Sequence, residues 1–148
     1  MSQEDKNLLL IVLSVGLPYG IKVLNTAEGL NEICKLDSIM TSRSGRDCFV
    51  GLTLPDDSIM TGIEMVKPYL RPMSFMTEEE CDMVEEILGD KCIFDFMANG
   101  DIVLKQGQFS QNKLAKLYDY YNSIHVDYRG LIPMGLAIEA PEGMYDIK

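Results

Sequence analysis

The sequence has little histidine, little positive charge and no long apolar run. A single histidine, His125, occurs among 148 residues, so a Ser-His-Asp triad has one possible base. A multi-histidine metal site within one chain is excluded for the same reason. Lys and Arg number 13 against 23 Asp and Glu, which gives a net charge of -10. A generically basic nucleic-acid binder is therefore excluded, because nothing would neutralise a phosphate backbone over a broad face.

The most apolar stretch, residues 8–17, is too short to cross a bilayer, which needs about 20 residues. The three charged residues ahead of it sum to a negative charge, whereas a secretory signal needs a positive segment and a small-residue cleavage site. Ser2 and Asp5 instead form an S-x-x-D capping signature, which predicts a buried first helix that ends near Gly16. We therefore expect a cytoplasmic protein of a bacterial host, without membrane association.

The four cysteines form no CxxC pair, so a structural zinc knuckle is not expected. They are Cys34, Cys48, Cys81 and Cys92. The chain is long enough to build a core without disulfides, and the cysteines have apolar neighbours, so we predict reduced, buried thiols. No Walker loop, GxGxxG, GxSxG or HExxH motif is present, and we expect neither a cofactor nor a bound metal.

The residue pattern divides the chain into a β-rich half, residues 17–76, and a helix and hairpin half, residues 77–148. The first half predicts four short strands, at residues 21–24, 32–40, 48–54 and 63–70. Pro68 and Pro72 indicate that the last of these is an edge strand or an extended exit. We expect an α+β fold as a single domain over residues 1–148. A small antiparallel sheet or partial barrel would share one core with helices and a β-hairpin.

Three local sequence signals predict the helices and the hairpin of the second half. Thr77 and Glu80 have the spacing of a capping box, which predicts a helix that ends at Gly89. Two apolar runs flank Asn99–Gly100, a strong hairpin signal. Ser110 can cap a second helix.

The apolar face of that second helix is predicted from the spacing of its residues. The residues assigned to it are Leu114, Leu117, Tyr118, Tyr121 and His125. Tyr120 lies off this face, so we expect its ring to be exposed.

Negative charge is concentrated in the second half. Residues 1–76 carry a net charge of -2 and residues 77–148 a net charge of -8. Seven acids and no base occur within residues 77–90: Glu78, Glu79, Glu80, Asp82, Glu85, Glu86 and Asp90. A solvated helix face explains such a run, with the early acids favoured by the helix dipole. A docking face for a basic protein partner also explains it, and Glu85 and Glu86 favour this second interpretation because the dipole does not help them there.

The best candidate for chemistry is the segment from His125 to Gly130. His125 and Asp127 could share a proton or a metal ion, and Arg129 could bind a phosphate or a carboxylate. The structural alternative is that His125 completes the apolar face of its helix, while Asp127 and Arg129 pair or cap locally.

Four segments, spread over the length of the chain, carry a resemblance. They are LPYGIKV (residues 17–23), VKPYLRPMS (66–74), DYRGLI (127–132) and GLAIEAPEGMY (135–145). The chain resembles a group of short uncharacterised proteins of gut anaerobic bacteria, their prophages and mobile elements. The resemblance implies a phage or mobile-element setting, and it transfers no catalytic residue.

These observations predict a non-enzymatic accessory protein that binds a host or phage protein with a basic surface. The predicted partner-binding residues are Glu78, Glu79, Asp82, Glu85, Glu86, Asp90 and Tyr120. Three alternatives stay open: a DNA mimic, a small phosphate-ligand binder or enzyme that uses His125, Asp127 and Arg129, and a structural virion component. Direct nucleic-acid binding is not expected, and the oligomeric state is left open.

Overall fold

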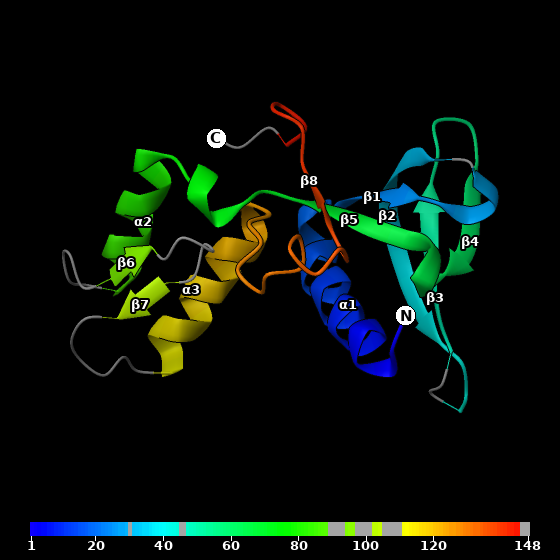
Figure 1. Ribbon diagram of the computed structural model, residues 1–148, viewed down its shortest axis with the longest axis horizontal. Coiled ribbons are helices and arrows are strands. Elements are labelled where there is room, and N and C mark those ends of the chain that lie inside the picture. Colours follow the sequence, from blue (N-terminus) through cyan, green and yellow to red (C-terminus); the bar gives the residue numbers. More distant parts are fainter. Residues whose placement is uncertain (30, 45–46, 89–93, 97–101, 105–110, 146–148) are drawn as a thin grey trace. The chain divides into compact units, whose positions relative to one another are not determined.

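The computed structural model describes residues 1–29, 31–44, 47–88, 94–96, 102–104 and 111–145 (Figure 1). It divides the chain into two compact units. Unit 1 comprises Met1–Tyr69 and Gly135–Ile138, and unit 2 comprises Leu70–Met134 and Glu139–Lys148. The predicted α+β class is confirmed. That both halves form a single domain stays a prediction.

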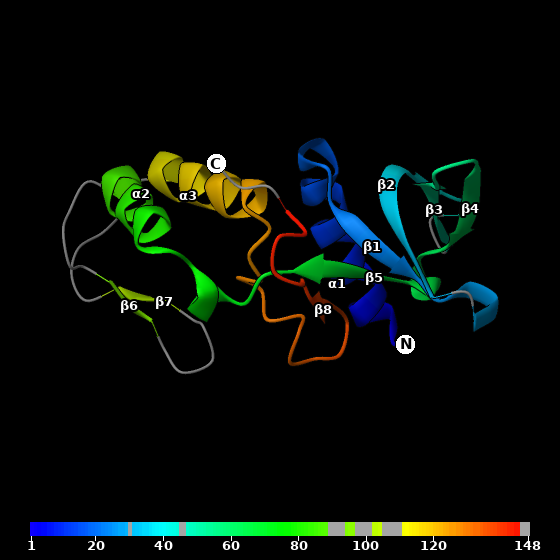
Figure 2. The same cartoon turned by 90° about the horizontal axis from the view of Figure 1, so that it is seen from above.

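An open six-stranded sheet forms most of unit 1, with the strand order β4-β3-β2-β1-β5-β8. The strands are β1 (Lys22–Asn25), β2 (Glu32–Thr41), β3 (Cys48–Thr53), β4 (Ser58–Gly62), β5 (Val66–Leu70) and β8 (Ile138–Glu139). Every pairing from β4 across to β5 is antiparallel. Figure 2 shows these strands from above. The sheet is not closed, so it does not form a complete barrel.

The sequence predicted that β5 is an edge strand or an extended exit, and the edge-strand alternative is wrong. Pro68 is buried and lies opposite Val23 of β1, while β8 lies on the other side of β5. Because β8 comes from the far end of the chain, local sequence gives no sign that β5 is covered. The strand β4 was not predicted, since its five residues lie next to a turn signal and carry no clear alternation.

The helix α1 (Gln3–Gly16) begins as predicted. The Asp5 backbone N–H donates to Ser2 Oγ at 3.0 Å, and the Ser2 N–H returns a bond to the Asp5 carboxylate. A Cβ at Gly16 would lie 2.8 Å from Ile21 Cδ1, so a larger residue there would collide with the start of the sheet. The helix places Leu9 and Leu13 fully inside the core of unit 1. Short 3-10 helices connect the elements at Leu17–Tyr19, Ala27–Gly29, Ile63–Met65 and Met73–Phe75.

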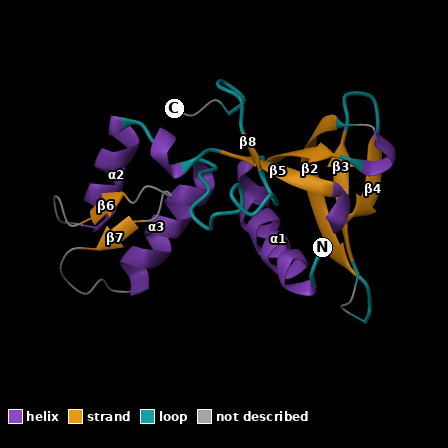
Figure 3. Cartoon of the chain, in the orientation of Figure 1, coloured by secondary structure: helices purple, strands orange, loops and turns teal. Residues whose placement is uncertain are grey.

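Two helices and a hairpin form unit 2 (Figure 3). They are α2 (Glu78–Leu88), β6 (Phe94–Phe96), β7 (Ile102–Leu104) and α3 (Gln111–Ser123). The antiparallel pairing of β6 with β7 confirms the predicted hairpin strands, whereas Gly89, Asn99–Gly100 and Ser110 lie outside the described residues. The core of this unit contains Met73, Val84, Leu88, Leu117, Tyr121, Ile124 and Val126.

The cysteines differ in burial. Cys34 is buried, whereas Cys48 and Cys81 are half-buried, and all three are free thiols. Cys92 lies outside the described residues. The prediction that the thiols are buried is therefore wrong for Cys48 and Cys81, which are only half-buried. Of the helices in the part of the chain that the structure describes, none combines the length and the apolar character that a bilayer crossing requires.

Candidate functional site

The helix α2 presents most of the predicted acidic residues to solvent. Glu78, Asp82 and Glu86 are exposed, and their i, i+4 spacing aligns them in one row along the helix. Glu79 is exposed on the neighbouring row. Glu85 is half-buried, and Asp90 lies outside the described residues. We call the exposed side chains of Glu78, Glu79, Asp82 and Glu86 the acidic face.

The opposite side of α2 explains why the acidic face points outward. Val84 and Leu88 are fully buried in the core of unit 2, and they lie on the side of the helix away from the acidic row. At the end of α2, Lys113 Nζ donates to the Leu88 carbonyl oxygen at 3.1 Å. Within α2 itself no base offsets the acids. Each like-charged i, i+4 pair destabilises a helix by about 0.2–0.5 kcal/mol, so the acidic face opposes helix formation.

Tyr120 does not belong to this surface. The sequence predicted an exposed ring, but Tyr120 is half-buried and packs against the core of unit 2. The inward face of α3 runs through Leu117, Tyr121 and Ile124, and Tyr120 falls on it by i, i+3 and i, i+4 spacing. Burial is the main cause that raises the pKa of the Tyr120 hydroxyl, and Glu80 adds to it. Tyr118, which was assigned to the apolar face, is exposed instead.

The helix α3 ends before His125. The Val126 N–H donates to the Tyr121 carbonyl oxygen and the His125 N–H to that of Asn122, both at 3.3 Å. These two bonds define a Schellman motif, in which His125 takes the left-handed position with φ of 59°. Glycine usually fills that position, because other residues are strained there by about 1–2 kcal/mol. The prediction that His125 lies on the apolar face of the helix is therefore wrong.

The three side chains of the predicted ligand cluster have separate roles. The buried His125 ring stacks on Tyr145, with 3.8 Å between ring centroids. Asp127 is also buried, and its two carboxylate oxygens accept the backbone N–H groups of Leu131 and Ile132 at 2.7 and 2.8 Å. Arg129 is exposed and its guanidinium lies 5.3 Å from the centre of the Tyr128 ring. Of the structural alternative, only the local cap by Asp127 is realised, because His125 lies beyond the helix and Arg129 contacts a ring.

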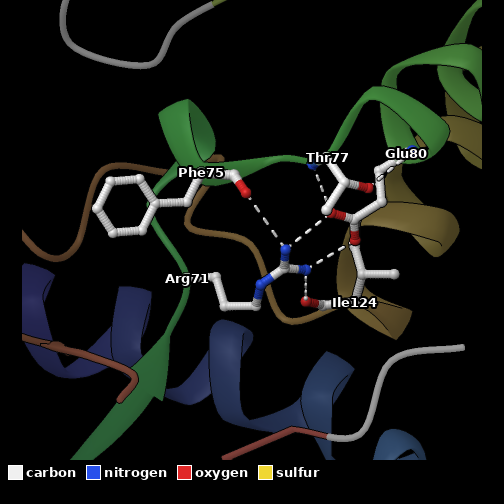
Figure 4. Close-up of polar contacts among 5 residues, drawn as sticks. All are labelled: Arg71, Phe75, Thr77, Glu80 and Ile124. Atoms are coloured by element: carbon white, nitrogen blue, oxygen red, sulfur yellow. Dashed lines mark hydrogen bonds and ion pairs between the residues drawn. The ribbon is translucent and has the colours of Figure 1, made fainter. Parts of the chain in front are cut away.

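The sequence did not reveal the role of Arg71, which connects the start of α2 to the end of α3 (Figure 4). Its guanidinium forms a two-pronged ion pair with Glu80, with Nη1 to Oε2 and Nη2 to Oε1 both at 2.7 Å. It also donates to the carbonyl oxygens of Ile124 and Phe75. The Arg71 side chain is 16% exposed and that of Glu80 only 7%, so the pair is largely shielded from water. Prolines flank Arg71 in the segment VKPYLRPMS, but nothing in the neighbouring sequence indicates that Arg71 pairs with Glu80.

The backbone of Arg71 also forms hydrogen bonds, with the residues that follow α3. Its N–H donates to the His125 carbonyl oxygen at 2.7 Å, and its own carbonyl oxygen accepts the Asp127 N–H at 2.8 Å. Glu80 meanwhile completes the predicted capping box, because it accepts the Thr77 N–H and its own N–H donates to Thr77 Oγ1. Arg71 therefore joins the start of α2 to the end of α3. This arrangement makes the cluster a structural junction of unit 2.

The Glu80 carboxylate should make the stability of unit 2 depend on pH. Burial acts to raise the pKa of Glu80, but hydrogen bonds from Arg71 and Thr77 and the charge of Arg71 outweigh it and lower the pKa below 4.5. A lowered folded-state pKa stabilises the fold at pH values above 4.5, and this contribution is lost as the pH falls through the folded-state value. We expect the difference in urea midpoint between wild type and Glu80→Gln to be large at pH 7 and to shrink steadily below about pH 4.5. A difference that stays constant with pH would contradict this assignment.

Comparisons with protein-family models, with curated proteins and with solved structures found no match for this chain. Among the described residues, no group of three or more His, Cys, Asp and Glu side chains is placed to hold a metal ion. The interpretation of the two candidate sites therefore rests on geometry. Among the described residues the acidic face is exposed to solvent, whereas the His125, Asp127 and Arg129 segment makes contacts within unit 2.

Proposed function

We propose that this protein is a non-enzymatic accessory protein that binds a host or phage protein through the acidic face of α2. The phage or mobile-element setting rests on the sequence resemblance alone. The observation that carries the binding proposal is the exposed row of Glu78, Asp82 and Glu86, which has no base on the same helix. Such a row destabilises an isolated helix, so its presence is better explained by a partner that supplies the opposite charge.

The surroundings of the acidic face indicate the chemistry of the partner. Met83 is 41% exposed and lies beside Glu79 on α2, so an apolar contact is available next to the carboxylates. The partner would present Lys or Arg side chains around a small apolar patch. Charge-based docking of this kind mainly raises the association rate and is weakened by salt.

The test is a tagged pull-down from host lysate, with and without nuclease, followed by affinity measurement with the captured protein. The variant Glu78→Lys/Asp82→Lys/Glu86→Lys should lower the affinity by at least about tenfold, because it reverses the acidic row. The matched control is Asp47→Lys/Glu139→Lys/Glu142→Lys, which changes the net charge equally at exposed positions elsewhere. Circular dichroism verifies that both variants fold.

Three results would distinguish the alternatives. Equal loss of affinity in both triple variants would show that only net charge matters, and it would overturn the proposal that the partner binds at the acidic face. Competition between duplex DNA and the protein for the same partner would support a DNA mimic. Capture that disappears with nuclease would indicate an indirect, nucleic-acid-mediated contact and would contradict the proposal.

A further inference from the structure

A second surface lies in unit 1, at the edge of the sheet formed by β4. This strand pairs with β3 over five successive positions without a bulge, from Phe49 opposite Gly62 to Thr53 opposite Ser58. Among the described residues no strand pairs with its other side, and Figures 1 and 2 both show β4 at the outer end of the sheet. Apart from the Ser58 N–H, which donates to the Asp57 carboxylate, the backbone groups along that side are not paired with a strand of the described residues and can accept one.

The residues of β4 itself lack the features that usually prevent strand addition. Proteins protect exposed edges with charged residues, proline, bulges or very short strands. The opposite edge strand, β8, has only two residues. By contrast, β4 has the sequence SIMTG, without proline or charge, and its pairing with β3 is regular. It is the better template for an added strand.

Apolar side chains cover the sheet face beside this edge. Met60 of β4 lies opposite Gly51, and Phe49 lies opposite Met40 on β2, so strand alternation places all three large side chains on one face. They are 55%, 40% and 45% exposed, respectively. An added strand would extend this face and cover Met60 with its own alternate side chains.

Acidic groups stand at both ends of the edge. The Asp57 carboxylate accepts the Ser58 N–H at 2.7 Å at the start of β4. At the other end the Glu64 carboxylate lies over Gly62, where a Cβ would come within 2.5 Å of Oε1. A strand with basic residues at its two ends would therefore complement the edge.

We propose that the edge of β4 binds an extended segment of a different protein by strand addition, with alternating apolar residues in its centre and Lys or Arg at its ends. This site is separate from the acidic face of α2. The charges argue against a second copy of this chain as the occupant. An antiparallel pair of β4 strands would bring the end that carries Asp57 in each copy to the end that carries Glu64 in the other, and like charges that meet in this way are destabilising.

The probe is a fluorescein-labelled peptide of about ten residues, with alternating Thr and Val flanked by two Lys at each end. A second peptide has Glu in place of Lys, and a third keeps Lys but carries N-methyl groups on alternate core amides. Fluorescence anisotropy with the full chain should show binding of the Lys-flanked peptide at least about tenfold tighter than either of the others. The N-methylated peptide keeps the charge, so it separates strand pairing from simple attraction to acids.

Protein variants locate the contact. Met60→Lys should weaken binding of the Lys-flanked peptide by about tenfold or more, because it places a charge on the edge. Met134→Lys is the matched control, since Met134 is 51% exposed and lies in unit 2, and it should leave binding unchanged. Asp57→Asn/Glu64→Gln keeps the shapes and should reduce the preference for Lys over Glu to about twofold or less.

Equal binding of the N-methylated and unmethylated peptides, or equal loss in both methionine variants, would overturn strand addition. Dimerisation of the free chain that Met60→Lys abolishes would show that a second copy is the occupant and would also overturn the proposal. The Lys-flanked peptide should still bind to the triple lysine variant of α2. That result would show that the edge of β4 and the acidic face of α2 act separately, so that the two proposals are tested independently.

Discussion

Replacing Arg71 with methionine should lower the free energy of unfolding by about 3–5 kcal/mol, the usual cost of removing one member of a buried ion pair. Glu80 would keep its charge but lose both guanidinium contacts, and the carbonyl oxygens of Ile124 and Phe75 would lose a donor. Because those groups belong to unit 2, the loss should appear first in signals from α2 and α3. Urea denaturation followed by circular dichroism and tyrosine fluorescence measures it.

Two further variants show whether the ion pair itself is responsible. Arg71→Met/Glu80→Met removes both charges, so no carboxylate is left buried without a partner, and it should recover part of the loss. Arg71→Lys keeps the charge but cannot form the two-pronged contact, and should fall between wild type and Arg71→Met. A change of less than about 1 kcal/mol for Arg71→Met would show that the pair behaves as an exposed surface salt bridge.

Replacing Asp127 with alanine should cost about 2–4 kcal/mol, since two backbone N–H groups lose their acceptor and each such loss costs about 1–3 kcal/mol when the group is shielded from water. The groups are the N–H of Leu131, which is fully buried, and that of Ile132, which is half-buried. Asp127→Asn keeps one acceptor and should cost less than alanine. Thermal and urea denaturation give both values.

Arg129→Ala is the control for the same segment, and it should change stability by no more than about 0.5 kcal/mol because the side chain is exposed. If His125, Asp127 and Arg129 instead bind a phosphate group, Arg129→Ala should change the response of the protein to phosphate. There, inorganic phosphate would raise the melting temperature of wild type and of Asp127→Asn, but not of Arg129→Ala. A phosphate-dependent shift lost only in Arg129→Ala would revive that alternative.

Local signals in the sequence predicted the starts of two helices correctly. Ser2 with Asp5 and Thr77 with Glu80 form the expected capping boxes, because these bonds span only three residues. The strands β1, β2 and β3 also follow from short apolar runs between turn residues. The concentration of acids in α2 and the α+β class needed no tertiary information.

Other features depended on contacts between distant residues. Whether β5 is an edge strand depends on β8, which lies about half the chain away in sequence, and the two edge strands of the sheet are β4 and β8. The inward face of α3 was predicted correctly at Leu117 and Tyr121. Its flank was assigned to Tyr118 and not to Tyr120, because the two residues are chemically alike and only packing against the core distinguishes them.

Tertiary structure also decided the role of each charged side chain. Glu80 looked like one acid among seven, yet its pairing with Arg71 makes it part of the interior, while Glu78, Asp82 and Glu86 remain on the surface. Asp127 looked like a candidate ligand, yet its carboxylate is bonded to two backbone N–H groups. Sequence alone determined which charges are present and where helices begin, because those are local properties. The folded chain determined which charges meet a partner inside the protein, because burial and long-range pairing arise only when distant segments pack together.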